Sequence, residues 1–582
     1  MYIIKKIILL ACAGFLLLSC SLLEREPQVI EPETYYESES AVLHGLAGVY
    51  GVINSAEFYG NYYSIVASNI DDLCYFNRAM QTNYFEYNRH NAGTSQIYEM
   101  WAKIYEGVNN ANAYIEAMRD NSFDPYGRYG NEARFLRAYY HFILAQAWGD
   151  VPLRDSVVSS YGSTSCAATS QFKVLEWAAS EMEACAGFFA GLYAEHPEFE
   201  EEDLSSAPSR ICASTVHGIL ARVYLFMAGE SVRVEGEQVK EDYYRKAMEH
   251  AKTVIDSGRH TLNPVYSDVF VNMISDRYDR EYRESIWEAD FKGDRTSADN
   301  WSNGRIGDLL GLYSGGNSTD YAKFNCNYAY GKYNGSLKLW DLYWTMDRTD
   351  DEGELEEVTD SRQEWNMPPY NYQGSNTNPP YKSGLATGSS LAGIDKTPYK
   401  YGGVSTSDDP TAAQAVRNCG KFRREVVYEG QKTAKNLYTS INFPILRYSD
   451  VLLMYAEASN ELNGVSQEAY DCVKMVRDRA GIKTKDMGTY GKSSFRTLVR
   501  NERGRELCFE SLRKYDLIRW GIYVREMNDY GKWTADDRWS KSTALASYAA
   551  DMGDAVKQMH VVLPIPSIEL GVNTLLVQNP LW

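Results

Sequence analysis

The sequence lacks the residue patterns of the common catalytic and redox sites. None of the eight cysteines after residue 20 stands in a C-x-x-C pair, which excludes a zinc ribbon and a thioredoxin-type redox site. No His-Glu-x-x-His sequence occurs. Gly491-Lys492-Ser493 resembles the end of a phosphate-binding loop, but Asp486 stands where that motif requires glycine. We therefore predict a protein that is not an enzyme, has no catalytic residues and needs no cofactor.

Positive charge is also scarce. Lysine and arginine number 59 against 78 aspartate and glutamate residues, a formal net charge of −19. An acidic chain repels the phosphate backbone of DNA and RNA, so we predict no nucleic-acid partner.

One acidic stretch resembles a calcium loop. It runs from Asp347 through Asp350 and Asp351 to Glu352, and Glu352 stands where an EF-hand loop requires glycine. The stretch is therefore not an EF-hand. A looser structural calcium site stays open here, and no other metal site is predicted.

Only one long apolar run exists, and it lies at the N-terminus. Lys5 and Lys6 precede apolar residues 7–18, a pattern typical of a secretory signal and too short for a stable membrane span. The run ends in Leu17-Leu18-Ser19-Cys20, which resembles the lipobox of bacterial lipoproteins. We predict a signal peptide over residues 1–19, acylation of Cys20, and an anchor and tether over residues 20–31. The alternative is an ordinary secretory signal with an incidental cysteine.

Apolar residues recur at helical spacing in several segments. Such spacing predicts helices over 132–148, 209–229, 242–257, 449–462 and 467–480. Small residues within the later helices allow close helix packing, as in tetratricopeptide-type hairpins, although no strict repeat of ~34 residues holds. We predict a mostly α fold, a scaffold of helical hairpins interrupted by long irregular loops.

Two segments of the chain are irregular. Residues 293–403 are rich in Gly, Asn, Ser, Asp and Tyr, and residues 58–94 form a shorter stretch of the same kind. Irregular segments of this length are uncommon in compact domains unless they have a function. The chain also carries 46 Tyr and 12 Trp, side chains that are frequent at binding surfaces.

Several phrases in these helices and loops, in order along the chain, carry a family resemblance. They are Pro32-Glu33-Thr34-Tyr35-Tyr36, the run 132–140 (EARFLRAYY) with Gly149-Asp150-Val151-Pro152, the run 446–458 (LRYSDVLLMYAEA), the run 476–481 (VRDRAG), Glu502-Arg503 with residues 506–520, Pro564-Ile565-Pro566 and Gln578-Asn579-Pro580. Together they resemble the SusD/RagB family of outer-membrane nutrient-binding lipoproteins across essentially the whole mature chain.

The resemblance implies both a fold and a function. Residues 32–290 would form an N-terminal helical region, and residues 291–582 a C-terminal region with a long loop insertion and helical hairpins. The protein would be lipid-anchored at the cell surface, bind a glycan and deliver it to a SusC-like TonB-dependent transporter of the outer membrane. Peptide capture, or a scaffold that holds a protein partner and binds no glycan, are the alternatives.

The candidate ligand-binding residues follow from loop position and side-chain type, because sugars suit aromatic faces beside amide and charged groups. In the first segment they are Asp72, Tyr75, Phe76, Asn83 and Tyr84, and in the second they are Trp301, Tyr313, Tyr321 and Trp340. Trp340 falls in a short predicted helix and could pack in the core. Trp101 and Trp287 are assigned to packing.

Charged residues near the C-terminus form a further pattern. Glu502, Arg503, Glu506, Glu510, Arg513 and Asp516 recur at three- and four-residue spacing, which predicts one helix stabilised by opposite charges. Glu506 and Glu510 resemble a pair of catalytic carboxylates, but arginines beside them favour an ion-pair network.

Overall fold

The computed structural model describes most of the chain after the predicted tether. The described residues are 35–158, 164–235, 239–275, 277–291, 304–313, 329–343, 360–368, 370–371, 381–382, 395–398, 400–401, 404–405, 417–424, 438–530 and 543–582. Cys20, Trp301, Tyr321 and the acidic stretch 347–352 lie outside them.

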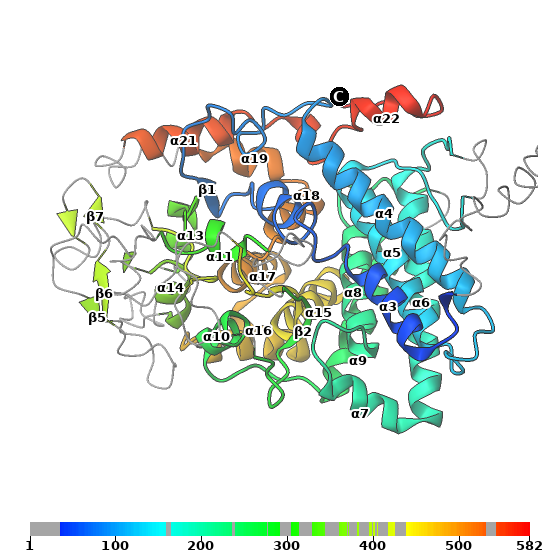
Figure 1. Ribbon diagram of the computed structural model, residues 1–582. Coiled ribbons are helices and arrows are strands. Elements are labelled where there is room, and N and C mark those ends of the chain that lie inside the picture. Colours follow the sequence, from blue (N-terminus) through cyan, green and yellow to red (C-terminus); the bar gives the residue numbers. More distant parts are fainter. Residues whose placement is uncertain are drawn as a thin grey trace, which may run out of the picture.

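Long helices pack side by side in chain order and form the body of the molecule (Figure 1). They are α4 (Ser95–Met118), α5 (Arg128–Trp148), α6 (Gln171–Glu195), α8 (Ala213–Met227), α9 (Lys240–Asp256), α15 (Tyr448–Asn463), α16 (Gln467–Arg479) and α17 (Lys492–Leu507). Each helix packs against the helix that follows it in this list, and α15 packs against both α16 and α17. The predicted mostly α fold of helical hairpins is confirmed.

The predicted helix bounds hold to within four residues. The helix expected from residue 209 begins at Ala213, and Cys212 is its N-cap. Ser209 lies in a turn before the helix, and the extended backbone of Cys212, with φ −129° and ψ 177°, precedes its first turn. Within α8, a Cβ at Gly218 would lie 2.4 Å from a methyl group of Leu446, which explains why glycine stands at this helix contact.

Shorter helices surround this body. They are α3 (Glu39–Tyr50), the π-helix η1 (Tyr62–Ala67), α7 (Pro197–Ser205), α10 (Tyr266–Ile274), α11 (Ile306–Leu309), α13 (Leu337–Leu342), α14 (Ser361–Asn366), η6 (Met487–Thr489), α18 (Arg513–Arg519), α19 (Tyr523–Asn528), α21 (Thr543–Asp554), η8 (Gln558–Val561) and α22 (Ser567–Val572). The predicted short helix around Trp340 is confirmed as α13. No helix among these described residues is long and apolar enough to cross a membrane.

Short antiparallel strands join segments that are distant in the sequence. Strand β1 (Cys74–Phe76) pairs with β3 (Tyr333–Gly335), and β2 (Ser285–Ala289) pairs with β9 (Phe443–Arg447) through an irregular register. Strands β4 (Tyr370–Asn371), β5 (Tyr381–Lys382) and β6 (Asp395–Pro398) form a small sheet, and β7 (Lys400–Tyr401) pairs with β8 (Val404–Ser405). Trp287 in β2 is fully buried against Phe135 and Tyr139, which confirms its assignment to packing, and Trp101 is buried as well.

The charged pattern at residues 502–516 does not form one helix. Helix α17 ends at Leu507, and Phe509 and Ser511 adopt positive φ values of 64° and 63° before α18 begins. Left-handed residues break the helical path, so the side chains on either side of the turn point in different directions.

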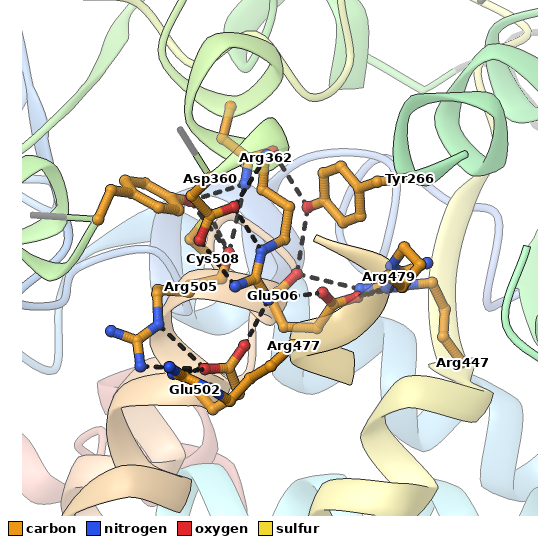
Figure 2. A network of polar contacts seen from close by, with 12 residues as sticks. Tyr266, Asp360, Arg362, Arg447, Arg477, Arg479, Glu502, Arg505, Glu506 and Cys508 are labelled. Carbon is orange, nitrogen blue, oxygen red and sulfur yellow. Dashed lines mark hydrogen bonds and ion pairs between the residues drawn. The ribbon is translucent and has the colours of Figure 1, made fainter. Parts of the chain in front are cut away.

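These side chains nevertheless form the predicted ion-pair network, and it is buried (Figure 2). Glu506 accepts from Arg479 at 2.6 Å, Arg447 at 3.0 Å and Arg362 at 3.1 Å. Arg447 also forms two bonds with Glu510, both at 2.8 Å. Burial alone would raise the pKa of Glu506, but Arg479, Arg447 and Arg362 lower it to about 2. Glu506 is therefore an ionised structural group.

Candidate functional site

The two irregular segments meet on one side of the molecule. Strand β1 of the first segment pairs with β3 of the second, and the backbone N–H of Asn77 donates to the Lys332 carbonyl at 2.8 Å. The Arg305 amide donates to the Gly60 carbonyl at 2.8 Å, a second link between the segments. The described parts of both segments are thus held by backbone hydrogen bonds.

A buried asparagine cluster fixes this junction. The side-chain amide of Asn77 donates to the Gly331 carbonyl at 2.8 Å and to the side-chain oxygen of Asn334 at 2.6 Å. The Asn418 amide donates to the same two oxygens at 3.1 and 2.8 Å, and its own side-chain oxygen accepts from the Tyr313 backbone at 3.3 Å. Buried amides with satisfied hydrogen bonds specify one arrangement of the chains around them.

Above this cluster lies a partly exposed surface of aromatic and charged side chains. We define the junction surface as Arg78, Tyr84, Glu86, Arg305, Tyr313, Tyr330 and Lys332, all half-buried or exposed. Arg78 donates to the Tyr330 carbonyl at 2.9 Å, and the Lys332 ammonium lies 5.3 Å from the Tyr330 ring centroid. The surface therefore offers aromatic faces beside groups that donate and accept hydrogen bonds.

The charges of the junction surface are partly desolvated. Burial lowers the pKa of Lys332, and nearby Arg305 adds to that effect. Burial also raises the pKa of Glu86. Both shifts disfavour the charged form, which is the expected result of placing charges against aromatic rings and backbone instead of water. Hydrogen bonds from a polar ligand would meet little competing water here.

Asp72 does not face this surface, which corrects its prediction as a ligand contact. The side chain is buried, accepts two bonds from Arg513 at 2.8 and 2.9 Å, and lies 2.5 Å from the Lys338 ammonium. Its carboxylate oxygens are occupied by ion pairs that stabilise the fold.

Three predicted aromatic contacts are also core residues. Tyr75 is fully buried, and its hydroxyl accepts from Asn334 at 2.9 Å. Phe76 packs edge-on against Tyr333, with ring centroids 5.4 Å apart. Trp340 is buried beneath the Arg417 guanidinium, which lies 4.3 Å from its ring centroid. Their positions on β1 and α13 point these rings inward, so they do not line the junction surface.

The remaining predicted residues fall into two groups. Tyr84 is 52% exposed, and Asn83 and Tyr313 are half-buried beside or within the junction surface. Their roles stay a prediction. Trp301 and Tyr321 lie outside the described residues. Sequence reasoning missed Arg78, Tyr330 and Lys332, although the density of tyrosine around residue 330 marked the segment.

Metal ligation has no candidate in the described ranges. Within them, no group of three or more histidine, cysteine, aspartate or glutamate side chains is arranged to hold a metal ion. The acidic stretch predicted to allow a calcium ion is not among them.

Comparison with known protein families identifies the family to which the chain belongs. Residues 283–582 match the family model described as the SusD family, and residues 22–225 match the model described as "Starch-binding associating with outer membrane". Since the first match alone spans half of the chain, the chain belongs to the SusD family, as its sequence phrases predicted.

Relatives and solved structures extend over nearly the whole chain. It is 24% identical to SusD-like protein P25 of Formosa agariphila over 97% of both chains. A SusD homolog from Bacteroides thetaiotaomicron shares its fold with a TM-score of 0.74 and 24% identity, over 96% of this chain and 100% of that one.

Two further structures with the same fold are described with a glycan. One is described with xylogluco-oligosaccharide, with a TM-score of 0.65, 17% identity and coverage of 92% of this chain and 97% of that one. The other is described as a laminarin-binding SusD-like protein, with a TM-score of 0.62, 19% identity and coverage of 93% and 99%.

Proposed function

We propose that this protein is a cell-surface glycan-binding lipoprotein and that the junction surface contacts the glycan. The observation that carries the proposal is the meeting of two irregular segments where Tyr330 lies beside Arg78 and Lys332, with the partly exposed Tyr84 and Tyr313 in the same two segments. Aromatic faces suit the C–H faces of sugar rings, and the charged and amide groups suit their hydroxyls. Two structures with this fold, one described with xylogluco-oligosaccharide and one as laminarin-binding, support the same ligand class.

The predicted lipid anchor supplies the location. Acylation of Cys20 would hold the chain at the outer membrane through its tether, and the description of the matched N-terminal model supports that membrane. From there the protein would deliver bound glycan to a SusC-like TonB-dependent transporter.

The protein acts by binding and not by catalysis. Glycoside hydrolysis needs two carboxylates about 5–10 Å apart across an accessible cleft. Glu506 and Glu510, which resemble such a pair in the sequence, are buried and bonded to arginines. This arrangement supports a structural role for both.

The test is a binding screen of the mature chain from Ser21 onward, against polysaccharides and peptides, by affinity gel and calorimetry. Retention by one glycan class is the expected result. Tyr84→Ala should then lower the affinity about tenfold, the loss of roughly 1.4 kcal/mol expected for one stacked ring. Tyr126→Ala is the matched control, because Tyr126 is 49% exposed and contacts His196 and Phe199 away from the junction surface.

The alternatives predict different results from the same screen. Peptide binding without glycan binding would identify a peptide-capturing protein. Absence of binding to both classes would favour a scaffold that holds a protein partner. Equal affinity of Tyr84→Ala and the wild type for a bound glycan would place the site elsewhere on the chain.

A further inference from the structure

A groove of about 700 Å³ lies along α4 and is separate from the junction surface. Its walls come from α4, from the segment that follows α5, and from α22, which approaches the start of α4 near the C-terminus (Figure 1). The Ser567 amide donates to the Ala92 carbonyl at 2.8 Å and fixes α22 beside the end of the first irregular segment. The groove is thus built from three segments that are distant in sequence.

Aromatic and apolar side chains form part of the lining. The half-buried Tyr105 ring packs against Trp101, with centroids 4.9 Å apart, and its hydroxyl donates to the Pro152 carbonyl at 2.7 Å. Val157 and Val572 stand at the rim, and Val572 is 75% exposed. These groups give the groove non-polar faces that water alone would solvate poorly.

The polar groups of the groove carry little uncompensated charge. Arg154 and Glu569 line it together; burial raises the pKa of Glu569, while Arg154 and a hydrogen bond from Trp101 act in the opposite direction. Glu106 is paired with Lys103 at 2.8 Å. The other polar side chains are neutral, and Asn109 is the most exposed amide among them. Such a lining suits a neutral polyhydroxylated ligand better than an ion.

One helix face connects the groove with the junction surface. Glu99 hydrogen-bonds Tyr62, which lies beside Arg305 of the junction surface. Ala102, Glu106 and Asn109 follow Glu99 at three- and four-residue steps, so they lie on the same side of α4, and they line the groove. Glu106 lies seven positions after Glu99, which corresponds to only about 10 Å along the helix.

We infer that this groove is a second glycan subsite, which takes the extension of a neutral oligosaccharide whose other end lies on the junction surface. The inference rests on the proposed function and adds to it a preference for long chains. A chain that reaches both places gains contacts that a short chain cannot make, so the groove acts on affinity only above a minimum ligand length.

The test compares chain lengths by calorimetry with the full mature protein. The probes are trisaccharides and long oligosaccharide fractions prepared from xyloglucan and from laminarin. Val572→Trp, which fills the groove, and Asn109→Ala, which removes an amide, should each weaken binding of the long fraction. A loss of about tenfold is expected for Val572→Trp, with less than about a twofold change for the trisaccharide. Leu575→Trp is the matched control, because Leu575 is also exposed on the C-terminal segment but does not line the groove.

The outcomes separate the inference from the proposed function. Unchanged affinity of both groove variants for long chains, together with weaker binding by Tyr84→Ala, would overturn the subsite and leave the proposed function intact. Equal losses for short and long chains would make the groove the primary site and overturn the two-part arrangement. Absence of any binding by the wild type to all four probes would count against xyloglucan or laminarin binding itself. Circular dichroism melting of each variant shows whether the fold is retained.

Discussion

The guanidinium of Arg513 binds the carboxylate of Asp72 through two parallel hydrogen bonds, Nε to Oδ1 at 2.8 Å and Nη2 to Oδ2 at 2.9 Å. This pair joins the first irregular segment to α18, across 441 residues of sequence. Both side chains are buried. The pair therefore holds the base of the junction surface against the C-terminal helices.

Asp72→Asn should destabilise the protein and leave the ligand surface chemically unchanged. Burial alone would raise the pKa of Asp72, but Arg513 and Lys338 hold it well below its usual range. Loss of the negative charge leaves the buried Arg513 without its partner, while the half-buried Lys338 keeps its ion pair with Glu526, and breaking a buried pair costs about 3–5 kcal/mol. Urea denaturation measures this loss, with the exposed Asp554→Asn as the control. Normal stability with lower glycan affinity would instead return Asp72 to the ligand site.

His141 should make the protein less stable in acid. Its Nδ1 lies 2.9 Å from the Arg137 carbonyl, and its Nε2 accepts from the Arg154 amide at 3.0 Å, which fixes the neutral ring. Burial lowers the pKa of His141 from 6.5 to about 4. A neutral buried histidine stabilises the fold fully above its unfolded pKa, and this stability is lost as pH falls from about 6.5 to about 4. The loss amounts to at most about 3 kcal/mol.

The measurement is the free energy of unfolding across that pH range. His141→Gln should reduce the slope, because glutamine does not titrate, although it also lowers stability at neutral pH. Part of the slope should remain, since burial also lowers the pKa values of His260 and His560 to about 4. The exposed His44→Gln should leave the slope unchanged. Burial and nearby Asp72 raise the pKa of Asp71 to about 7, which opposes the histidine slope, so the variant is compared with the wild type. Equal slopes for His141→Gln and the wild type would contradict the prediction.

Glu506→Gln tests whether the paired carboxylates are structural. The variant replaces the negative charge among Arg362, Arg447 and Arg479, so we expect a loss of about 3–5 kcal/mol in the free energy of unfolding. Glu116→Gln on the exposed side of α4 should have little effect. A reducing-sugar assay should detect no glycan hydrolysis by the wild type. Hydrolysis that disappears in a folded Glu506→Gln variant would show that the carboxylate is catalytic.

The sequence was sufficient to predict the helical body because its signals are local. Apolar residues at three- and four-residue spacing and the glycines at 149, 464 and 481 mark helices and their ends. The turn between α17 and α18 could not be predicted, since Phe509 and Ser511 adopt left-handed conformations without the glycine that usually signals them.

The candidate site was harder to predict because burial depends on distant partners. Asp72 has the side chain of a ligand contact, and only the folded chain brings Arg513 to it. Every residue of β1 is buried, and the Tyr75 hydroxyl accepts from Asn334, a residue of the paired strand β3 that is distant in the sequence. The position of Tyr84 could be predicted more easily, because it lies in the irregular stretch after β1, and its side chain is exposed.

Gly331 allows two parts of the second irregular segment to approach each other closely at the junction surface, and its replacement should disturb ligand binding. Its φ is +51°, and a Cβ there would lie 2.7 Å from the Tyr313 backbone nitrogen. Gly331 and the Tyr313 backbone cannot move apart without shifting the asparagine cluster, because the Gly331 carbonyl accepts from the side chains of Asn77 and Asn418. Gly331→Ala should therefore cost about 1–3 kcal/mol and weaken glycan binding by displacing Tyr313 and Tyr330.

Gly464→Ala separates the effect of backbone strain from the effect of displacing Tyr313 and Tyr330. Gly464 has a φ of +78° at the end of α15, and a Cβ there would meet nothing within 4 Å. This variant should lose about 1 kcal/mol from the strained backbone alone and keep its glycan affinity. Calorimetric titration of both variants, at a temperature where both are folded, measures the difference. Equal glycan affinities would mean that the close approach of Gly331 to Tyr313 shapes the fold and not the ligand surface, because only Gly331→Ala crowds the Tyr313 backbone.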